Sequence, residues 1–293
     1  MRRKYNRQEI LRHDRRFTAA RGQSKSRAVI FSPTDLEPFL LELNRASGKV
    51  ILPLFRADHG LEDKDKGAGF DPVTEADRGA EAAIRQLIAE HHPDHGVIGE
   101  EYGEDRPGAE FVWVLDPIDG TRAFISGLPV WTTLIGLRHQ GVPVLGSIGQ
   151  PYIGEVFIGS TAGSRLITAG GETPLKTRRG VRLAEALIAT TDPRACFNAA
   201  EQAAWWSLQE SARLARYGCD AYAYAMVAAG KLDLVVECGL KSWDIDGPIP
   251  VVEGAGGLVR DWEGRPMGQS GGRAVIAGDA AILAEALAVM GKG

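Results

Sequence analysis

The sequence predicts an α+β half followed by an α/β half, which we place at residues 31–170 and 171–293. Two long helical patterns and then short strands broken by glycine fill the first half, whereas strands and helices alternate beyond about residue 175. The chain has 293 residues, of which 44% are hydrophobic and 25% charged. This composition is typical of an ordinary globular protein, long enough for one large domain or two packed halves.

The first half begins with two helices. Ser32 is a candidate N-cap followed by Pro and an acid, and the apolar residues after it recur at helical spacing. Residues 59–70 are charged and contain glycine, so we expect an exposed mobile loop, after which VTEAD (73–77) opens the second helix. The apolar runs 97–98 and 111–115 are expected to be buried strands that end in acids.

The remaining elements follow from the spacing of apolar residues and glycines. Between Trp131 and Ile167 the pattern predicts an antiparallel meander of short strands. Further strands are expected over 183–190, 232–237, 258–260 and 274–277, and helices over 199–215, 220–230, 244–257 and 279–290.

Charge is distributed unevenly along the chain. Residues 1–28 carry a local charge of +8, and the other 265 residues carry −12. We expect residues 1–30 to be a disordered basic extension, the alternative being a tail that contacts nucleic acid or a membrane surface. An acidic body argues against nucleic acid as a main partner, and no apolar run approaches the roughly 18 residues of a membrane span. Three cysteines without ligand spacing predict reduced thiols in a cytoplasmic protein.

The segment DPIDGT contains the most informative chemistry. Asp116 and Asp119 follow a predicted buried strand, and we expect a tight turn to hold both carboxylates. Oxygen ligands favour Mg²⁺, and Ile118 can offer its carbonyl while its side chain turns inward. The amides of Gly120 and Thr121 can face an anion. A metal cradle beside an anion site suits phosphate ester chemistry.

Each of these residues also has a purely structural interpretation. A DPxDG turn is common scaffolding, Asp77 can be the acid of a capping box, and Glu100 can belong to a solvated loop. Asp244 can simply begin a helix, where an acid complements the helix dipole. The coincidence of all of them in one chain favours the functional interpretation.

In combination, four motifs make the chain resemble the inositol monophosphatase-like family of Mg²⁺-dependent, lithium-sensitive phosphatases over roughly residues 34–290. The motifs are VTEAD (73–77), GEE (99–101), WVLDPIDGTRAF (113–124) and GLKSWDIDGPIPVVEGAGG (239–257). The resemblance implies a layered α-β-α-β-α sandwich of the inositol monophosphatase and fructose-1,6-bisphosphatase type. It also implies a homodimer that acts on a small phosphate monoester.

The same resemblance implies the roles of the site residues. Two or three Mg²⁺ ions are bound by Glu100, which also counts as catalytic, by Asp116, by the carbonyl of Ile118, and by Asp119 and Asp244. Asp77 and Thr121, hydrogen-bonded to each other, position a metal-activated water that attacks phosphorus. Gly120 and Thr121 bind the phosphate.

Other reaction classes fit the sequence less well. DIDG (244–247) has the spacing of the haloacid-dehalogenase DxD motif, but the residues before it do not predict a buried strand. The three cysteines have no activating neighbour in sequence, which argues against a cysteine nucleophile. His91, His92 and His95 surround a helix break, so we expect surface imidazoles and not metal ligands.

Within the family, residues 121–137 and 216–245 look most like the histidinol-phosphatase branch. The predicted function is therefore histidinol-phosphate phosphatase in histidine biosynthesis, the alternative being inositol-1-monophosphatase or another small-molecule phosphatase. Asp220 and Glu237 are the candidate pocket acids for the substrate ammonium. Asp220 has an alternative role as a helix cap, and Glu237 as a salt-bridge partner of Lys241.

Two questions remain open at the level of sequence. Gly247 and Pro248 stand where the family usually has helix formers, so we expect a looser turn next to Asp244. A different class of function, a catalytically silent binding protein or a nucleic-acid-associated factor that uses the basic tail, is disfavoured because every expected metal ligand is present.

Overall fold

The computed structural model describes residues 32–57, 61–63 and 72–291. The predicted extension at 1–30 lies outside the described residues, as does most of the predicted loop at 59–70. The described part of that loop forms strand β1 (Leu61–Asp63), which pairs antiparallel with β2 (Pro72–Thr74). Three residues of the predicted loop are therefore extended.

The two predicted N-terminal helices are confirmed. A short 3₁₀ turn (Pro33–Leu36) precedes α1 (Glu37–Ile51), and the Ser32 backbone N–H donates to Asp35 Oδ2 at 3.3 Å. Helix α2 (Glu75–His91) packs against α1. The face of each helix that carries the periodic apolar residues is buried, as the spacing predicts.

A sheet of eight strands follows, in the order β10-β9-β8-β7-β6-β5-β3-β4, and only β3 and β5 run parallel. Its strands are β3 (Gly96–Gly99), β4 (Gly103–Asp105), β5 (Phe111–Asp119), β6 (Thr132–His139), β7 (Val142–Gln150), β8 (Glu155–Ser160), β9 (Gly163–Thr168) and β10 (Gly171–Pro174). The predicted meander is confirmed. The two edge strands were not predicted, because all their residues are exposed and show no apolar alternation.

The second sheet has five strands in the order β12-β11-β13-β15-β14, with β11 parallel to both of its neighbours. Its strands are β11 (Leu187–Thr190), β12 (Leu214–Tyr217), β13 (Leu234–Leu240), β14 (Leu258–Arg260) and β15 (Gly272–Ala277). The remaining helices are α3 (Thr121–Ile125), a 3₁₀ turn (Leu183–Glu185), α4 (Pro193–Cys196), α5 (Ala199–Ser211), α6 (Asp220–Ala228), α7 (Ser242–Ile245), α8 (Pro248–Gly254) and α9 (Ala280–Met290).

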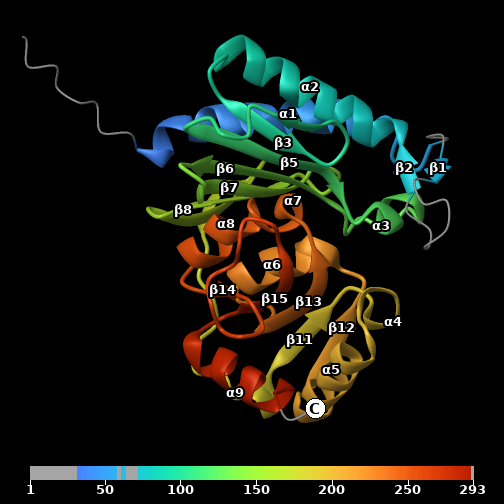
Figure 1. The fold of residues 1–293 in the computed structure, drawn as a ribbon, viewed down its shortest axis with the longest axis vertical. Coiled ribbons are helices and arrows are strands. Elements are labelled where there is room, and N and C mark those ends of the chain that lie inside the picture. Colours follow the sequence, from blue (N-terminus) through green and yellow to red (C-terminus); the bar gives the residue numbers. More distant parts are fainter. Residues whose placement is uncertain (1–31, 58–60, 64–71, 292–293) are drawn as a thin grey trace, which may run out of the picture. The chain divides into compact units, whose positions relative to one another are not determined.

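The helices separate and cover the two sheets (Figure 1). Helices α1 and α2 contact strands β5, β6 and β7 of the first sheet, and α7 and α8 pack on its other side. Helix α6 contacts strands of both sheets, while α5 and α9 pack together beyond the second sheet. The order of layers is therefore α-β-α-β-α, which confirms the predicted sandwich.

Two predicted helices have other boundaries than expected. The helix expected over 199–215 ends at Ser211, and its last residues form β12, because parallel pairing with β11 replaces the helical hydrogen bonds. The helix expected over 244–257 is divided into α7 and α8, since Pro248 has no N–H to continue the first of them and begins the second.

Gly247, at the junction of α7 and α8, has a helical backbone and packs directly on the first sheet. A Cβ at Gly146 of β7 would lie 2.1 Å from the Gly247 carbonyl oxygen, and one at Gly136 of β6 would lie 2.7 Å from the Asp246 carbonyl carbon. The expected loose turn is thus wrong. Glycines on both sides allow a close approach that fixes the segment next to Asp244.

The prediction of surface imidazoles is confirmed for His91, which is exposed, and is wrong for His92 and His95. His92 and His95 are half-buried and stack with ring centroids 4.6 Å apart, and the Trp113 indole N–H donates to His95 Nδ1 at 3.1 Å. Burial lowers the pKa of His95 to about 4, with the neighbouring His92 acting in the same direction. The two rings thus stack beside Trp113 of β5.

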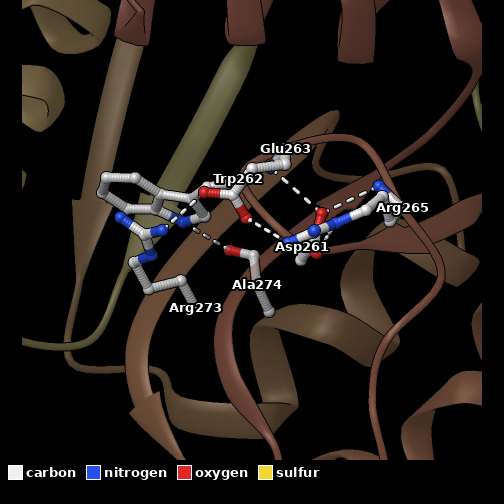
Figure 2. Close-up of polar contacts among 6 residues, drawn as sticks. All are labelled: Asp261, Trp262, Glu263, Arg265, Arg273 and Ala274. Atoms are coloured by element: carbon white, nitrogen blue, oxygen red, sulfur yellow. Dashed lines mark hydrogen bonds and ion pairs between the residues drawn. The ribbon is translucent and has the colours of Figure 1, made fainter.

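An exposed ion-pair network covers the connection between β14 and β15 (Figure 2). Asp261 accepts hydrogen bonds from the backbone and the Nε of Arg265, each at 2.8 Å, and Glu263 pairs with Arg265 at 3.0 Å. Arg273 lies 5.4 Å from the ring centroid of Trp262, whose indole N–H donates to the Ala274 carbonyl. The connection is therefore held by surface charges and one aromatic ring.

All three cysteines are free thiols, in agreement with the predicted absence of a disulfide framework. None of the helices in the described ranges has the length and apolar character needed to cross a membrane.

Candidate active site

The acids of DPIDGT lie within strand β5 and not in the expected tight turn. Asp116 pairs with Leu134 of β6 and Asp119 pairs with Thr132, so two residues of β5 face one residue of β6 in a bulge. Residues three apart on a regular strand point to opposite faces, but one inserted residue turns Asp119 back to the face of Asp116. The Thr133 hydroxyl stabilises the bulge by donating to the Pro117 carbonyl at 2.7 Å.

The residues after the bulge form the start of α3. The side chain of Ile118 is buried in the core cluster beneath α1 and α2, so it turns inward as predicted. Gly120 has a left-handed φ of +80° at the N-cap of α3. The Thr121 hydroxyl donates to the Ile118 carbonyl at 3.1 Å, and the expected hydrogen bond between Thr121 and Asp77 stays a prediction.

Asp244 joins Asp116 and Asp119 from the other half of the sequence. It lies in α7, which packs on β5 and β6, and its Oδ2 accepts the Lys241 backbone N–H at 2.7 Å. One carboxylate oxygen from each of the three aspartates lies within 4.8 Å of the others. The fold therefore brings together three predicted metal ligands from two distant segments.

The carboxylates of Asp116, Asp119 and Asp244 are buried close to one another, so their negative charges repel. Burial raises the pKa of Asp116 well above its ordinary value, and the negative charges of Glu100, Asp119 and Asp244 raise it further. Burial also raises the pKa of Asp244 to about 6. Within the described residues, Asp116 Oδ1 is buried and has no hydrogen-bond partner. An unpaired buried oxygen among repelling carboxylates fits a divalent cation, for which oxygen ligands are suited.

Asp77 and Glu100 approach the same cluster from α2 and from the end of β3. Asp77 is 2% exposed, and its charge contributes to the raised pKa of Asp116. Glu100 follows β3 directly, its backbone N–H donates to the Leu115 carbonyl at 3.3 Å, and among charges it has the largest effect on the pKa of Asp116. Both charges therefore act on Asp116, and the predicted roles of Asp77 and Glu100 as catalytic residue and metal ligand stay predictions.

Asp220 connects this cluster to a pocket. It begins α6 with an unusual left-handed φ of +43°, and the next backbone N–H, of Ala221, donates to Asp119 Oδ2 at 2.7 Å. A Cβ built on Gly120 would lie 2.9 Å from Asp220 Oδ2, so the carboxylate lies directly over the start of α3. Burial raises the pKa of Asp220 to about 6, while Arg122 and Thr191 act to lower it.

The pocket beside Asp220 has a volume of about 670 Å³. Charged and aromatic side chains line it, including Arg122, Asp192, Arg194, Trp206, Tyr217 and Asp220. Arg122 lies 3.6 Å from Asp192 in an exposed ion pair. Local sequence patterns gave no signal for Asp192 or Trp206, because only the fold places them in this pocket.

Glu237 does not line the pocket. It is 2% exposed, and its carboxylate accepts the backbone N–H and the hydroxyl of Thr191 at 2.8 and 2.9 Å. Burial raises the pKa of Glu237 to about 8, although the bonds from Thr191 act to lower it. Among the described residues its hydrogen bonds come from Thr190 and Thr191 and not from Lys241. Thr191 itself lines the pocket, so Glu237 supports the pocket wall from behind.

Comparison with known proteins agrees with this geometry. The model of the inositol monophosphatase family matches residues 33–290. A protein of Arabidopsis thaliana called bifunctional phosphatase IMPL2, chloroplastic, is 42% identical over 239 residues, which are 80% of this chain and 67% of that protein. A histidinol-phosphatase of Chlorobaculum parvum is 33% identical over 257 residues, or 86% of this chain and 95% of the relative.

A solved structure leads to the same family. The structure of an inositol monophosphatase from Zymomonas mobilis superimposes with a TM-score of 0.80 at 38% identity and covers 89% of this chain and 99% of that one. The sequence motifs, the layered sandwich and the carboxylate cluster all agree with these matches. The chain therefore belongs to the inositol monophosphatase family of phosphatases.

Proposed function

We propose that this protein is a Mg²⁺-dependent histidinol-phosphate phosphatase. The observation that carries the proposal is the position of Asp220, whose carboxylate lies over Gly120 beside the candidate metal cluster and also lines the adjoining pocket. A phosphate held at the cluster would place its leaving group in that pocket, next to a carboxylate. Such a site suits a leaving group with a positive charge.

The metal ligands in this proposal are Glu100, Asp116, the carbonyl of Ile118, Asp119 and Asp244, holding two or three ions. When bound, Mg²⁺ neutralises the phosphate, activates water and stabilises the leaving oxygen. The unpaired Asp116 Oδ1 and the mutual repulsion of the carboxylates support this assignment.

The chain's own residues then supply orientation. We assign the phosphate to the amides of Gly120 and Thr121, at the start of α3. The Thr121 hydroxyl is held by the Ile118 carbonyl, and with Asp77 it orients the water that attacks phosphorus. No covalent phosphoenzyme is needed, since water is the nucleophile.

The pocket supports a cationic substrate. Burial raises the pKa of Asp220 to about 6, and Arg122, which pairs with Asp192, acts to lower it, so Asp220 is ionised at neutral pH. An ammonium group facing Asp220 gains a charge-assisted hydrogen bond worth about 1.5–3 kcal/mol, whereas inositol offers only neutral hydroxyls. Trp206 and Tyr217 provide aromatic faces for the imidazole of histidinol. Glu237 takes part through Thr191.

The test is the turnover of a phosphate ester panel with Mg²⁺, using the wild type and Asp220→Asn. We expect the wild type to prefer histidinol phosphate over inositol 1-phosphate. Asp220→Asn should lower kcat/KM for histidinol phosphate about tenfold or more, with a smaller effect on inositol 1-phosphate. Glu210→Gln, an exposed acid on α5, is the matched control. Equal losses on both esters, or a wild-type preference for inositol 1-phosphate, would favour the inositol-1-monophosphatase alternative.

The homodimer, the cytoplasmic location and the lack of a nucleic-acid partner stay predictions. Salt-dependent DNA binding, measured on the full chain and on a variant lacking residues 1–28, tests the last of them. Tight binding that is lost with the tail would contradict it.

A further inference from the structure

Glu81 is a buried charge with no assigned role. It lies on α2 four residues after Asp77, on the same buried face, and is 0% exposed. Burying a carboxylate is costly unless it is paired and hydrogen-bonded. A position that served packing alone would be at least as stable with an apolar side chain.

The partners of Glu81 lie in the turn that follows β3. Glu81 Oε2 accepts the backbone N–H of Glu101 at 2.8 Å, and Oε1 accepts that of Tyr102 at 3.2 Å. Arg85 Nε also donates to Oε1, at 2.7 Å, and Arg85 donates in addition to the Gly103 carbonyl. The carboxylate therefore fixes the two amides directly after Glu100, and Arg85 compensates its charge.

The residue before Glu100 is held against the same carboxylate. A Cβ at Gly99 would lie 2.1 Å from Glu81 Oε1, so only glycine leaves room for this contact. Glu81 thus contacts the backbone on both sides of Glu100. The Glu100 backbone N–H in turn donates to the carbonyl of Leu115, the residue before Asp116, at 3.3 Å, and the Glu100 charge raises the pKa of Asp116.

We propose that Glu81 is a positioning residue, which holds the turn of residues 99–102 so that Glu100 faces the carboxylate cluster and the cluster binds Mg²⁺ with full affinity. This inference rests on the proposed metal site. Residues that orient a metal ligand typically change metal affinity about 10–100-fold when they are replaced.

The test is Mg²⁺ binding to Glu81→Gln, measured by calorimetry without substrate. Glutamine keeps the shape but directs an NH₂ group at one of the two backbone donors, so one bond of the turn is lost. We expect the Mg²⁺ dissociation constant to rise about tenfold or more. Excess Mg²⁺ should restore most of kcat, with the KM for the phosphate ester unchanged, because the phosphate and leaving-group sites are intact.

Glu90→Gln is the matched control, because Glu90 lies on the same helix and accepts a hydrogen bond only from the exposed Gln86, at 2.9 Å, among the described contacts. It should bind Mg²⁺ as the wild type does. Glu81→Asp, which keeps the charge but withdraws the oxygens by one methylene, provides a second variant if the glutamine variant does not fold. It should weaken Mg²⁺ binding by about threefold or more.

Wild-type Mg²⁺ affinity in either folded Glu81 variant overturns the proposal, as does a raised substrate KM with unchanged Mg²⁺ affinity. A wild type that does not bind Mg²⁺ at all overturns the proposed function itself, so the two failures are distinguishable.

Discussion

Asp244 and Asp246 are two residues apart, and burial raises the pKa of each to about 6. Asp246 forms a buried ion pair with Arg138, whose charge lowers its pKa. Asp244 instead lies within 4.8 Å of two other aspartates, Asp116 and Asp119. One buried acid is compensated inside the chain, and the other lies in a cluster whose members repel one another.

This difference indicates a structural role for Asp246 and a functional role for Asp244. A buried acid with its own arginine holds two segments together, here the α7–α8 junction and β6. A cluster of acids does not stabilise the folded state until a cation binds to it. We therefore expect such a cluster only where the bound cation has a function. The same comparison extends to the exposed network of Figure 2, where charges are paired in solvent and contribute little to stability.

The largest effect is expected for Asp116→Asn. Loss of one ligand charge should lower kcat by more than about 100-fold and weaken Mg²⁺ binding. Without Mg²⁺ the variant should melt at the wild-type temperature or above it, because a repelling charge is gone. EDTA should abolish wild-type activity, and Mg²⁺ should restore it. Activity near that of the wild type in Asp116→Asn or Asp244→Asn would contradict the metal assignment.

Thr121→Ala is expected to have the next largest effect, a loss of kcat. Its hydroxyl is fixed by the Ile118 carbonyl, so its removal should lower kcat by about 100-fold with little change in KM. Thr121→Ser keeps the hydroxyl and should retain most of the activity. A selective rise in KM would instead mean that Thr121 only holds phosphate.

Arg138→Met tests the structural role of the buried ion pair between Arg138 and Asp246. It leaves Asp246 buried and unpaired, which should cost about 3–5 kcal/mol and lower Tm by at least about 6 °C. Mg²⁺ affinity of the folded variant should be unchanged. The double variant Arg138→Met/Asp246→Asn should recover part of the loss. Arg265→Met, in the exposed network, should leave Tm unchanged, and an equal drop there would refute the distinction.

The smallest effect concerns the pH dependence of stability. The pKa of Glu237 is raised by burial to about 8, so between the ordinary carboxyl range and pH 8 the native state binds a proton that the unfolded state has lost. The proton on native Glu237 therefore stabilises the fold at acid pH. This stabilisation is lost as the pH rises from the ordinary carboxyl range to about 8.

Glu237→Gln cannot titrate, so its Tm relative to the wild type should increase from pH 5 to pH 8. Because Glu237 lies behind Thr191, the substitution should change substrate preference less than Asp220→Asn. A difference in Tm that does not depend on pH would show that Glu237 is ionised in the fold.

Several features followed from local sequence alone. The last helix was predicted over 279–290, and Asp279 caps it, since its Oδ1 accepts the backbone N–H groups of Ala281 and Ile282. The meander and the two N-terminal helices were likewise visible as apolar periodicity. Asp116, Asp119 and Asp244 were predicted as metal ligands by motif, since residue type and neighbours within a few positions are local properties.

Tertiary structure decided the rest, because the relevant contacts join segments far apart in sequence. Pairing of β5 with β6 created the bulge that turns Asp119 to the side of Asp116. The packing of α6 and β13 placed Asp220 at the pocket and buried Glu237 behind its wall. Whether an acid faces a cavity, a partner or another acid depends on which segments the fold brings next to it, and no short window of sequence contains that information.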